Sequence, residues 1–126
     1  RLARANPPRS IVTLEDPIEM AIAGVTQSQV RPDSGFDLAD GLRSVLRQDP
    51  EVIMIGEIRD ATTAQVALQA SLTGQLVLSS FHAGSAAEAL ARLLDMGLEP
   101  YMLTSGVLDA AIYWAIVAQS QSGELP

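Results

Sequence analysis

The chain has 126 residues with a formal net charge of −7, and 48% of its residues are hydrophobic. This apolar content supports a buried core and excludes global disorder, while the acidity argues against nucleic-acid binding through a general basic surface. All eight basic residues are Arg, and the chain has no Cys and a single His. A Lys nucleophile, a P-loop Lys, a disulfide framework and a His-rich metal site are therefore excluded within these residues.

The first half of the sequence predicts two strands and a helix. The β-branched run 11–14 is typical of a buried strand, and the more polar run 25–30 predicts a strand at the edge of a sheet. Apolar residues then recur at helical spacing between Asp37 and the Asp49-Pro50 pair, which ends the helix. Ser34 or Asp37 is expected to cap its start.

The second half continues the alternation of strands and helices. Residues 52–55 form a continuous apolar run, which suits a central parallel strand covered on both faces, and a turn is expected over 56–60. The other elements that the pattern predicts are a helix over 62–72, a strand over 76–78, a helix over 85–95 and a last helix over 102–117. On the helix over 85–95, Leu93 and Leu94 are expected to face the core.

Alternating strands and helices of this kind predict βαβ units and a mostly parallel sheet in an α/β fold. In such sheets ligands bind at the carboxyl ends of the strands. Polar side chains directly follow three of the predicted strands: Glu15 and Asp16, then Glu57, and then His82. If the strands are parallel, these groups converge on one edge of the sheet, which is where we expect the functional site.

The carboxylates in this set suit phosphate chemistry. Glu57, at the protected rim of a buried strand, can polarise a water for attack on phosphorus or help to hold Mg²⁺ through its waters. The alternative is a solvated turn residue or a partner for Arg59. Glu15 and Asp16 are adjacent, so in an extended strand they point to opposite faces. One can face a metal while the other orients it or pairs with an Arg; the alternative is a charged strand end before a proline turn.

The remaining polar candidates carry weaker signals. His82 can contact a phosphate or sense its presence, or it is a hydrogen-bonded structural residue. A nucleophile pair of Ser80 and His82 is the weaker idea, because no nucleophile-elbow sequence accompanies it. Arg43, Arg47 and Arg59 suit phosphate or intersubunit contacts, or each is a solvent-facing Arg paired with an acid. No Gly-rich phosphate loop opens a helix in these residues.

Three stretches resemble the conserved boxes of the secretion ATPase family, which powers type II secretion and type IV pilus assembly. Residues 12–19 resemble its acidic Asp box, and residues 42–60 look like its Walker B region with the preceding helix. Residues 74–82 resemble its His box. The boxes occur in the family's order, and the resemblance extends from about residue 11 to about residue 106.

The resemblance implies the RecA-like α/β core of a P-loop NTPase, with a mostly parallel sheet flanked by helices. The Walker A loop of the family is not among these residues, so we expect a fragment truncated at both ends. Residues 1–118 would be a partial ATPase domain and residues 119–126 an unstructured tail. Gly56 stands where many other P-loop enzymes carry the Walker B Asp. The family that this chain resembles tolerates Gly there.

The resemblance also implies roles for individual residues, with ATP and Mg²⁺ as the cofactors of the full-length protein. Glu57 would be the catalytic carboxylate that activates water for attack on the γ-phosphate. Glu15 and Asp16 would support the attacking water and Mg²⁺, through water molecules. His82 would lie near the γ-phosphate and couple its loss to motion. The residues expected to contact the nucleotide are Arg43, Arg59 and Glu19.

By the same resemblance, the full-length protein is expected to be a cytoplasmic homo-hexamer, peripheral to the inner membrane. Its partners would be an inner-membrane platform protein and the pilin or pseudopilin machinery, with no nucleic acid. The alternative is a non-catalytic remnant or an oligomer-interface module, since these residues lack the P-loop and any Lys. A regulatory α/β domain that binds another small ligand is a third and weaker reading. This fragment alone is expected to be inactive.

Overall fold

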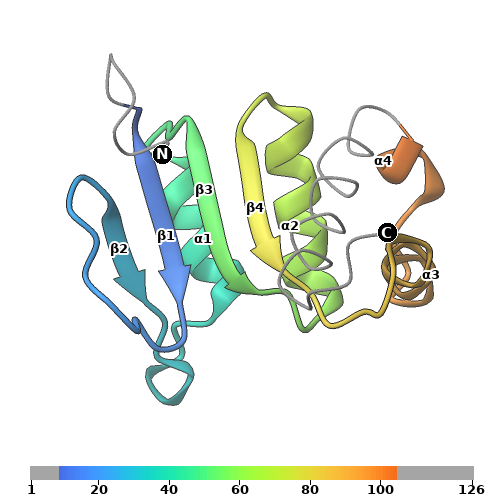
Figure 1. The fold of residues 1–126 in the computed structure, drawn as a ribbon, viewed down its shortest axis with the longest axis horizontal. Coiled ribbons are helices and arrows are strands. Elements are labelled where there is room, and N and C mark those ends of the chain that lie inside the picture. Colours follow the sequence, from blue (N-terminus) through green and yellow to red (C-terminus); the bar gives the residue numbers. More distant parts are fainter. Residues whose placement is uncertain (1–8, 105–126) are drawn as a thin grey trace.

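A four-stranded parallel sheet forms the centre of the structure, a computed structural model that describes residues 9–104. The strands lie in the order β2-β1-β3-β4, and every neighbouring pair is parallel (Figure 1). Their bounds are β1 Ile11–Glu15, β2 Thr26–Gln29, β3 Val52–Glu57 and β4 Leu76–Ser80. The polar strand β2 lies at an edge and the apolar strand β3 lies inside, as their compositions predicted. The expected cover on both faces of β3 is wrong for the described residues, because Met54 is 40% exposed.

Four α-helices accompany the sheet among residues 9–104. They are α1 Leu38–Leu46, α2 Ala61–Leu72, α3 Ala86–Asp95 and α4 Pro100–Thr104. Figure 1 shows α1 behind the sheet, α2 beside β4, and α3 and α4 on the far side of α2. Within the described part of the chain, no helix is both long and apolar enough to cross a membrane.

The core lies between one face of the sheet and the helices α1 and α2. Leu14 of β1 and Ile53 and Ile55 of β3 are fully buried there. They pack with Leu42 of α1 and with the face of α2 that carries Val66, Ala67 and Ala70. Because successive residues of a strand point to opposite faces, the residues between them face the other side of the sheet. A second apolar cluster joins α2 to α3 and α4.

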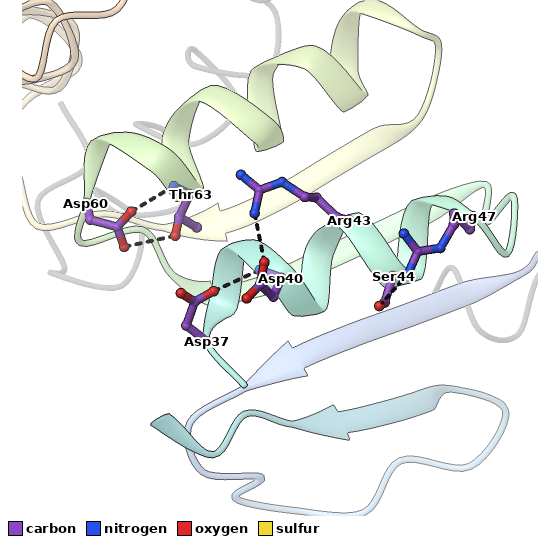
Figure 2. Close-up of polar contacts among 7 residues, drawn as sticks. All are labelled: Asp37, Asp40, Arg43, Ser44, Arg47, Asp60 and Thr63. Carbon is purple, nitrogen blue, oxygen red and sulfur yellow. Dashed lines mark hydrogen bonds and ion pairs between the residues drawn. The ribbon is translucent and has the colours of Figure 1, made fainter. Parts of the chain in front are cut away.

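Side-chain caps explain where the three longer helices begin. Asp37 accepts a hydrogen bond from the Asp40 amide at 2.8 Å, and Asp60 accepts one from the Thr63 amide at 2.7 Å (Figure 2). Ser85 caps α3 in the same way. Each cap satisfies an amide that would otherwise lack a partner in the first helical turn. Of the two candidates for the first cap, the structure selects Asp37.

The structure differs from the sequence prediction at the end of β3 and on α3. The predicted turn over 56–60 begins later, because β3 continues to Glu57, which pairs with Ser80 of β4 after a register shift. On α3, Leu93 is buried but Leu94 is 44% exposed, since Ala89 and Leu93 form the inward face. The rest of the helix predicted over 102–117, and the predicted domain boundary at 118, lie outside the described residues.

We predict that Asp60→Ala lowers the free energy of unfolding by about 1–2 kcal/mol, and Asp37→Ala by about half as much. Asp60 matters more because it also accepts a hydrogen bond from the hydroxyl of Thr63, a side chain that is only 1% exposed. Urea unfolding measures both losses. Asp60→Asn keeps one acceptor oxygen and serves as the control, so an equal loss in Asp60→Asn would contradict the capping explanation.

The close approach of α1 to β1 requires a glycine at position 41. A Cβ atom added to Gly41 would lie 2.9 Å from Cδ2 of Leu14 and 3.2 Å from the ring of Phe36. Leu14 is fully buried, so it has little room to move away. Overpacking therefore opposes the helix propensity that an alanine would add at this position.

We predict that Gly41→Ala destabilises the protein by about 1 kcal/mol, because an overpacking cost of about 1–3 kcal/mol exceeds a propensity gain of about 1 kcal/mol. A double-mutant cycle with Leu14→Ala, followed by urea unfolding, tests the cause. In the Leu14→Ala background the shortest contact is gone and only the contact with the Phe36 ring remains, so Gly41→Ala should cost clearly less or become neutral. A loss of the same size in both backgrounds would rule out this contact.

Candidate functional site

A pocket of about 280 Å³ lies at the carboxyl ends of β1 and β3. Its polar lining consists of five charged residues and one hydroxyl: Glu15, Asp16, Glu19, Glu57, Arg59 and Ser80. Gly56, Leu38 and Met54 contribute to the apolar part of its wall. The acids that were predicted to meet at one edge of the sheet do so in this pocket.

The register of the sheet explains this convergence. Leu14 lies beside Ile55 in the pairing of β1 with β3, so the strand ends Glu15 and Glu57 reach the same edge. Glu57 in turn lies beside Ser80, which brings the end of β4 to the pocket. Parallel strands place all their carboxyl ends on one side, and each strand ends in a polar residue here.

Glu15 is held by two neutral hydrogen-bond donors. The hydroxyl of Thr13 donates to its Oε1 atom at 2.5 Å, and the side-chain amide of Gln27 donates to the same atom at 2.9 Å. Sequence reasoning missed both donors. The available signals were a threonine within an apolar strand and two glutamines spaced by two residues on the edge strand β2.

Glu57 forms an ion pair with Arg59. The Nε atom of Arg59 donates to Oε2 of Glu57 at 2.7 Å. This hydrogen bond, together with the charge of Glu57 and a smaller contribution from Asp16, raises the pKa of Arg59 above its ordinary value. Arg59 therefore stays charged throughout the physiological range. The pairing with Arg59 that the sequence allowed is therefore present, and Glu57 lies at a strand end rather than in a turn.

Gly56 lies against the backbone of β1. A Cβ atom added there would be 3.4 Å from the carbonyl oxygen of Leu14 and 3.5 Å from Cα of Glu15. These are ordinary contact distances, so an alanine fits. The Cβ atom of any longer side chain, an aspartate included, would contact this backbone, and the rest of the side chain would extend from there at the edge of the pocket.

His82 does not line the pocket. It is exposed in the loop after β4, where its carbonyl oxygen accepts a hydrogen bond from Arg92 of α3. The guanidinium of Arg92 also lies over the ring of Phe81, 5.4 Å from the ring centre. The hydroxyl of Ser80 donates to the carbonyl of Gly56, so it is committed to β3 rather than to His82. The loop that carries His82 is thus tied to α3.

Arg43 lies on the exposed side of α1 and Arg47 is the exposed residue that follows its end, and neither lines the pocket. Arg43 pairs with Asp40 at 2.9 Å, and Arg47 donates to the hydroxyl of Ser44 at 3.0 Å. Figure 2 shows the first contact on α1 and the second at its C-terminal end. For Arg43 this is the alternative arrangement that the sequence allowed, a surface Arg paired with an acid.

Among residues 9–104, no three His, Cys, Asp or Glu side chains lie close enough together to hold a metal ion directly. Carboxylate oxygens are nevertheless suitable acceptors for the water molecules that Mg²⁺ retains. Glu15 and Asp16 are adjacent at the pocket, and the two donors of Glu15 both bind Oε1. The donor chemistry therefore fits a hydrated Mg²⁺ that is held through water.

The fold is of a class found in ATPases. The ATPase DotB of Legionella pneumophila is 35% identical to this chain, with a TM-score of 0.60 over 76% of this chain and 28% of its own. The pilus retraction motor PilT, solved with bound ADP, is also 35% identical, with a TM-score of 0.62 over 75% of this chain and 28% of its own. These similarities confirm the predicted α/β fold class.

The chain belongs to the family described as Type II/IV secretion system protein, which matches residues 2–120. Type II secretion system protein E of Dickeya dadantii is 56% identical over 100 residues, and Type II secretion system ATPase E of Vibrio cholerae is 55% identical over 100 residues. Each match covers 79% of this chain and 20% of the relative. The chain thus spans about a fifth of the length of these curated relatives, and the predicted family is confirmed.

We predict that Arg59→Met leaves the free energy of unfolding nearly unchanged, because exposed ion pairs contribute little. The side chain of Arg59 is 64% exposed. Urea unfolding at low and high salt measures the effect, which should shrink as salt screens the pair. Arg43→Met, which removes the other exposed pair, is the matched control. A much larger loss of stability in Arg59→Met would show that Arg59 stabilises the fold in addition to binding Glu57.

Proposed function

We propose that these residues are part of an ATP-hydrolysing motor that powers type II secretion or type IV pilus assembly. The observation that carries this proposal is the meeting of Glu15, Asp16 and Glu57 around one pocket at the carboxyl edge of a parallel sheet. Membership of the secretion family and the ATPase relatives support it. The pocket supplies carboxylates where a phosphate ester would need a base and a hydrated cation.

In this proposal Glu57 is the general base. Arg59 binds its Oε2 atom and so orients the carboxylate, while Oε1 takes a proton from the attacking water. The oxygen of that water forms a bond to the γ-phosphorus as the bond to the ADP oxygen breaks. Positioning and proton removal are the two contributions that a carboxylate at this place can make.

Glu15 and Asp16 would hold Mg²⁺ through water molecules. When bound with ATP, the ion neutralises charge on the phosphate oxygens. The role of this chain is to present acceptors at a fixed place, and the two hydrogen bonds to Glu15 restrict its carboxylate for that purpose. Full coordination by protein ligands is unnecessary, because Mg²⁺ retains several waters in nucleotide sites.

The remaining residues would contact the nucleotide or respond to it. Glu19 and Arg59 can do so from the pocket lining. His82 would sense the γ-phosphate, and its tie to Arg92 would pass a displacement of the loop to α3. Arg43 lies outside the pocket, so it would serve a nucleotide bound by a neighbouring subunit.

In the complete assembly we propose a cytoplasmic homo-hexamer that is docked on an inner-membrane platform protein and drives pilin or pseudopilin assembly. An ATP site at a subunit interface would account for an arginine such as Arg43 acting in trans. The competing proposal, a non-catalytic remnant or oligomer-interface module, predicts that the full gene product neither binds nor hydrolyses ATP.

We predict that Glu57→Gln lowers kcat for ATP hydrolysis by about 10²–10⁴-fold in the full gene product, because the amide cannot accept the proton of the attacking water. ATP affinity should stay nearly unchanged, since the side chain keeps its size. Phosphate release and nucleotide titration measure the two quantities. Glu51→Gln is the matched control, because Glu51 is exposed before β3, away from the pocket. Undiminished turnover in Glu57→Gln would contradict the proposed role.

A further inference from the structure

Gln27, on the edge strand β2, makes three hydrogen bonds with its side-chain amide. Its Nε2 atom donates to Oε1 of Glu15 at 2.9 Å and to the carbonyl oxygen of Met20 at 2.9 Å. Its Oε1 atom accepts from the backbone amide of Ile22 at 2.7 Å. One side chain therefore joins the acidic pocket to the connection between β1 and β2.

The chemistry of these partners allows only one orientation of the amide. The carboxylate of Glu15 and the carbonyl of Met20 are acceptors, whereas the amide of Ile22 is a donor. A rotation that exchanged Oε1 and Nε2 of Gln27 would place an acceptor against the acceptors of Glu15 and Met20 and a donor against the amide of Ile22. The two bonds to the connection thus aim the remaining Nε2 hydrogen at Glu15.

Thr13 supplies the second bond to the same oxygen of Glu15. Its side chain is 2% exposed and lies on the same face of β1 as Glu15, two residues earlier. Both donors bind Oε1, so Oε2 is the oxygen of Glu15 that remains for the pocket. The pair restrains rotation of the carboxylate without neutralising its charge.

We infer that Gln27 is a positioning residue that sets the orientation of the Glu15 carboxylate in the nucleotide site. The inference rests on the proposed function, because it assigns Gln27 a role in the reaction that Glu15 would support. Gln27 acts through Glu15 and has no contact with the reacting atoms in this role. Its contribution belongs to turnover rather than to ATP affinity.

Gln29 provides a matched control on the same strand. It lies two residues after Gln27, and its Oε1 atom accepts a hydrogen bond from the amide of Ile18 at 3.3 Å. It therefore holds the same connection between β1 and β2, while its side-chain hydrogen bond is with Ile18 and not with Glu15. Comparing the two glutamines separates support of the connection from orientation of the carboxylate.

The experiment measures ATP hydrolysis by the full gene product with Gln27→Met, Gln27→Glu or Gln29→Met. We predict that Gln27→Met lowers kcat by about tenfold or more, the effect of losing one hydrogen bond to a charged group, with KM for ATP within about twofold. Gln29→Met should keep the kcat of the unsubstituted protein. Equal kcat values in Gln27→Met and Gln29→Met would overturn the inference.

The separation of kcat from KM gives a readout that a merely structural role would not move. Gln27 does not line the pocket, so its loss leaves the groups that would contact ATP in place. Gln27→Glu replaces the donor to Glu15 with an acceptor, so its kcat should fall at least as far as that of Gln27→Met, again with KM for ATP within about twofold. A parallel rise in KM and fall in kcat would indicate general damage to the site and would overturn the inference.

Hydrogen exchange of the nucleotide-free protein supplies a readout that is independent of activity. Exchange in residues 17–25 should accelerate in both Gln27→Met and Gln29→Met, while exchange in α3 stays unchanged. If exchange does not accelerate in Gln27→Met, the bonds of Gln27 to Met20 and Ile22 do not hold the connection, and the inferred orientation of its amide is wrong. An unchanged kcat in Gln27→Glu, with Glu57→Gln inactive, would overturn the inference alone. Retained turnover in Glu57→Gln would instead overturn the proposed function.

Discussion

The parallel pairing of β1 with β3 is the constraint on which the rest of the structure depends. Its register places Leu14 beside Ile55, and both side chains are fully buried against α1 and α2. Because side chains alternate along a strand, burial of Leu14 directs Glu15 to the opposite face. A slip of one residue would bury the carboxylate and expose the leucine, so the apolar core fixes the direction of the acid. The same register brings Glu57 to the same edge.

The pocket holds its two strand-end carboxylates in different ways. Glu15 accepts hydrogen bonds from two neutral groups, which restrain it but leave its charge intact. Glu57 is paired with the cation of Arg59, which balances its charge at an exposed rim. An acidic protein can therefore gather carboxylates at one edge of its sheet without an equal number of cations. The difference also suits the proposed division of labour, in which one acid attracts a hydrated cation and the other accepts a proton.

Much of the fold could be predicted because its signals are local. The apolar run 52–55 and the polar run 25–30 indicated the central and edge strands correctly, because a strand with neighbours on both sides is more apolar than an edge strand. The exposure of Met54 shows that burial of β3 on both faces did not follow from its composition. The extension of β3 to Glu57 could not be predicted, because it depends on hydrogen bonds from β4, a strand that lies far along the chain. The exposure of Leu94 could not be predicted either. The apolar spacing of α3 allows either Leu93 or Leu94 to face inward, and packing against α2 buries Leu93 and leaves Leu94 exposed.

The sequence by itself determined which segments become strands and helices, and that acids stand at the ends of β1 and β3. Apolar spacing and caps such as Asp37 act over a few residues, so the order of the chain contains them. Only the tertiary structure decided the partner of each polar group. Gln27 reaches Glu15 from another strand, and Ser80 reaches Gly56 across 24 positions of the chain. Those contacts depend on the register of the sheet, which the burial of the apolar core sets and no local pattern specifies.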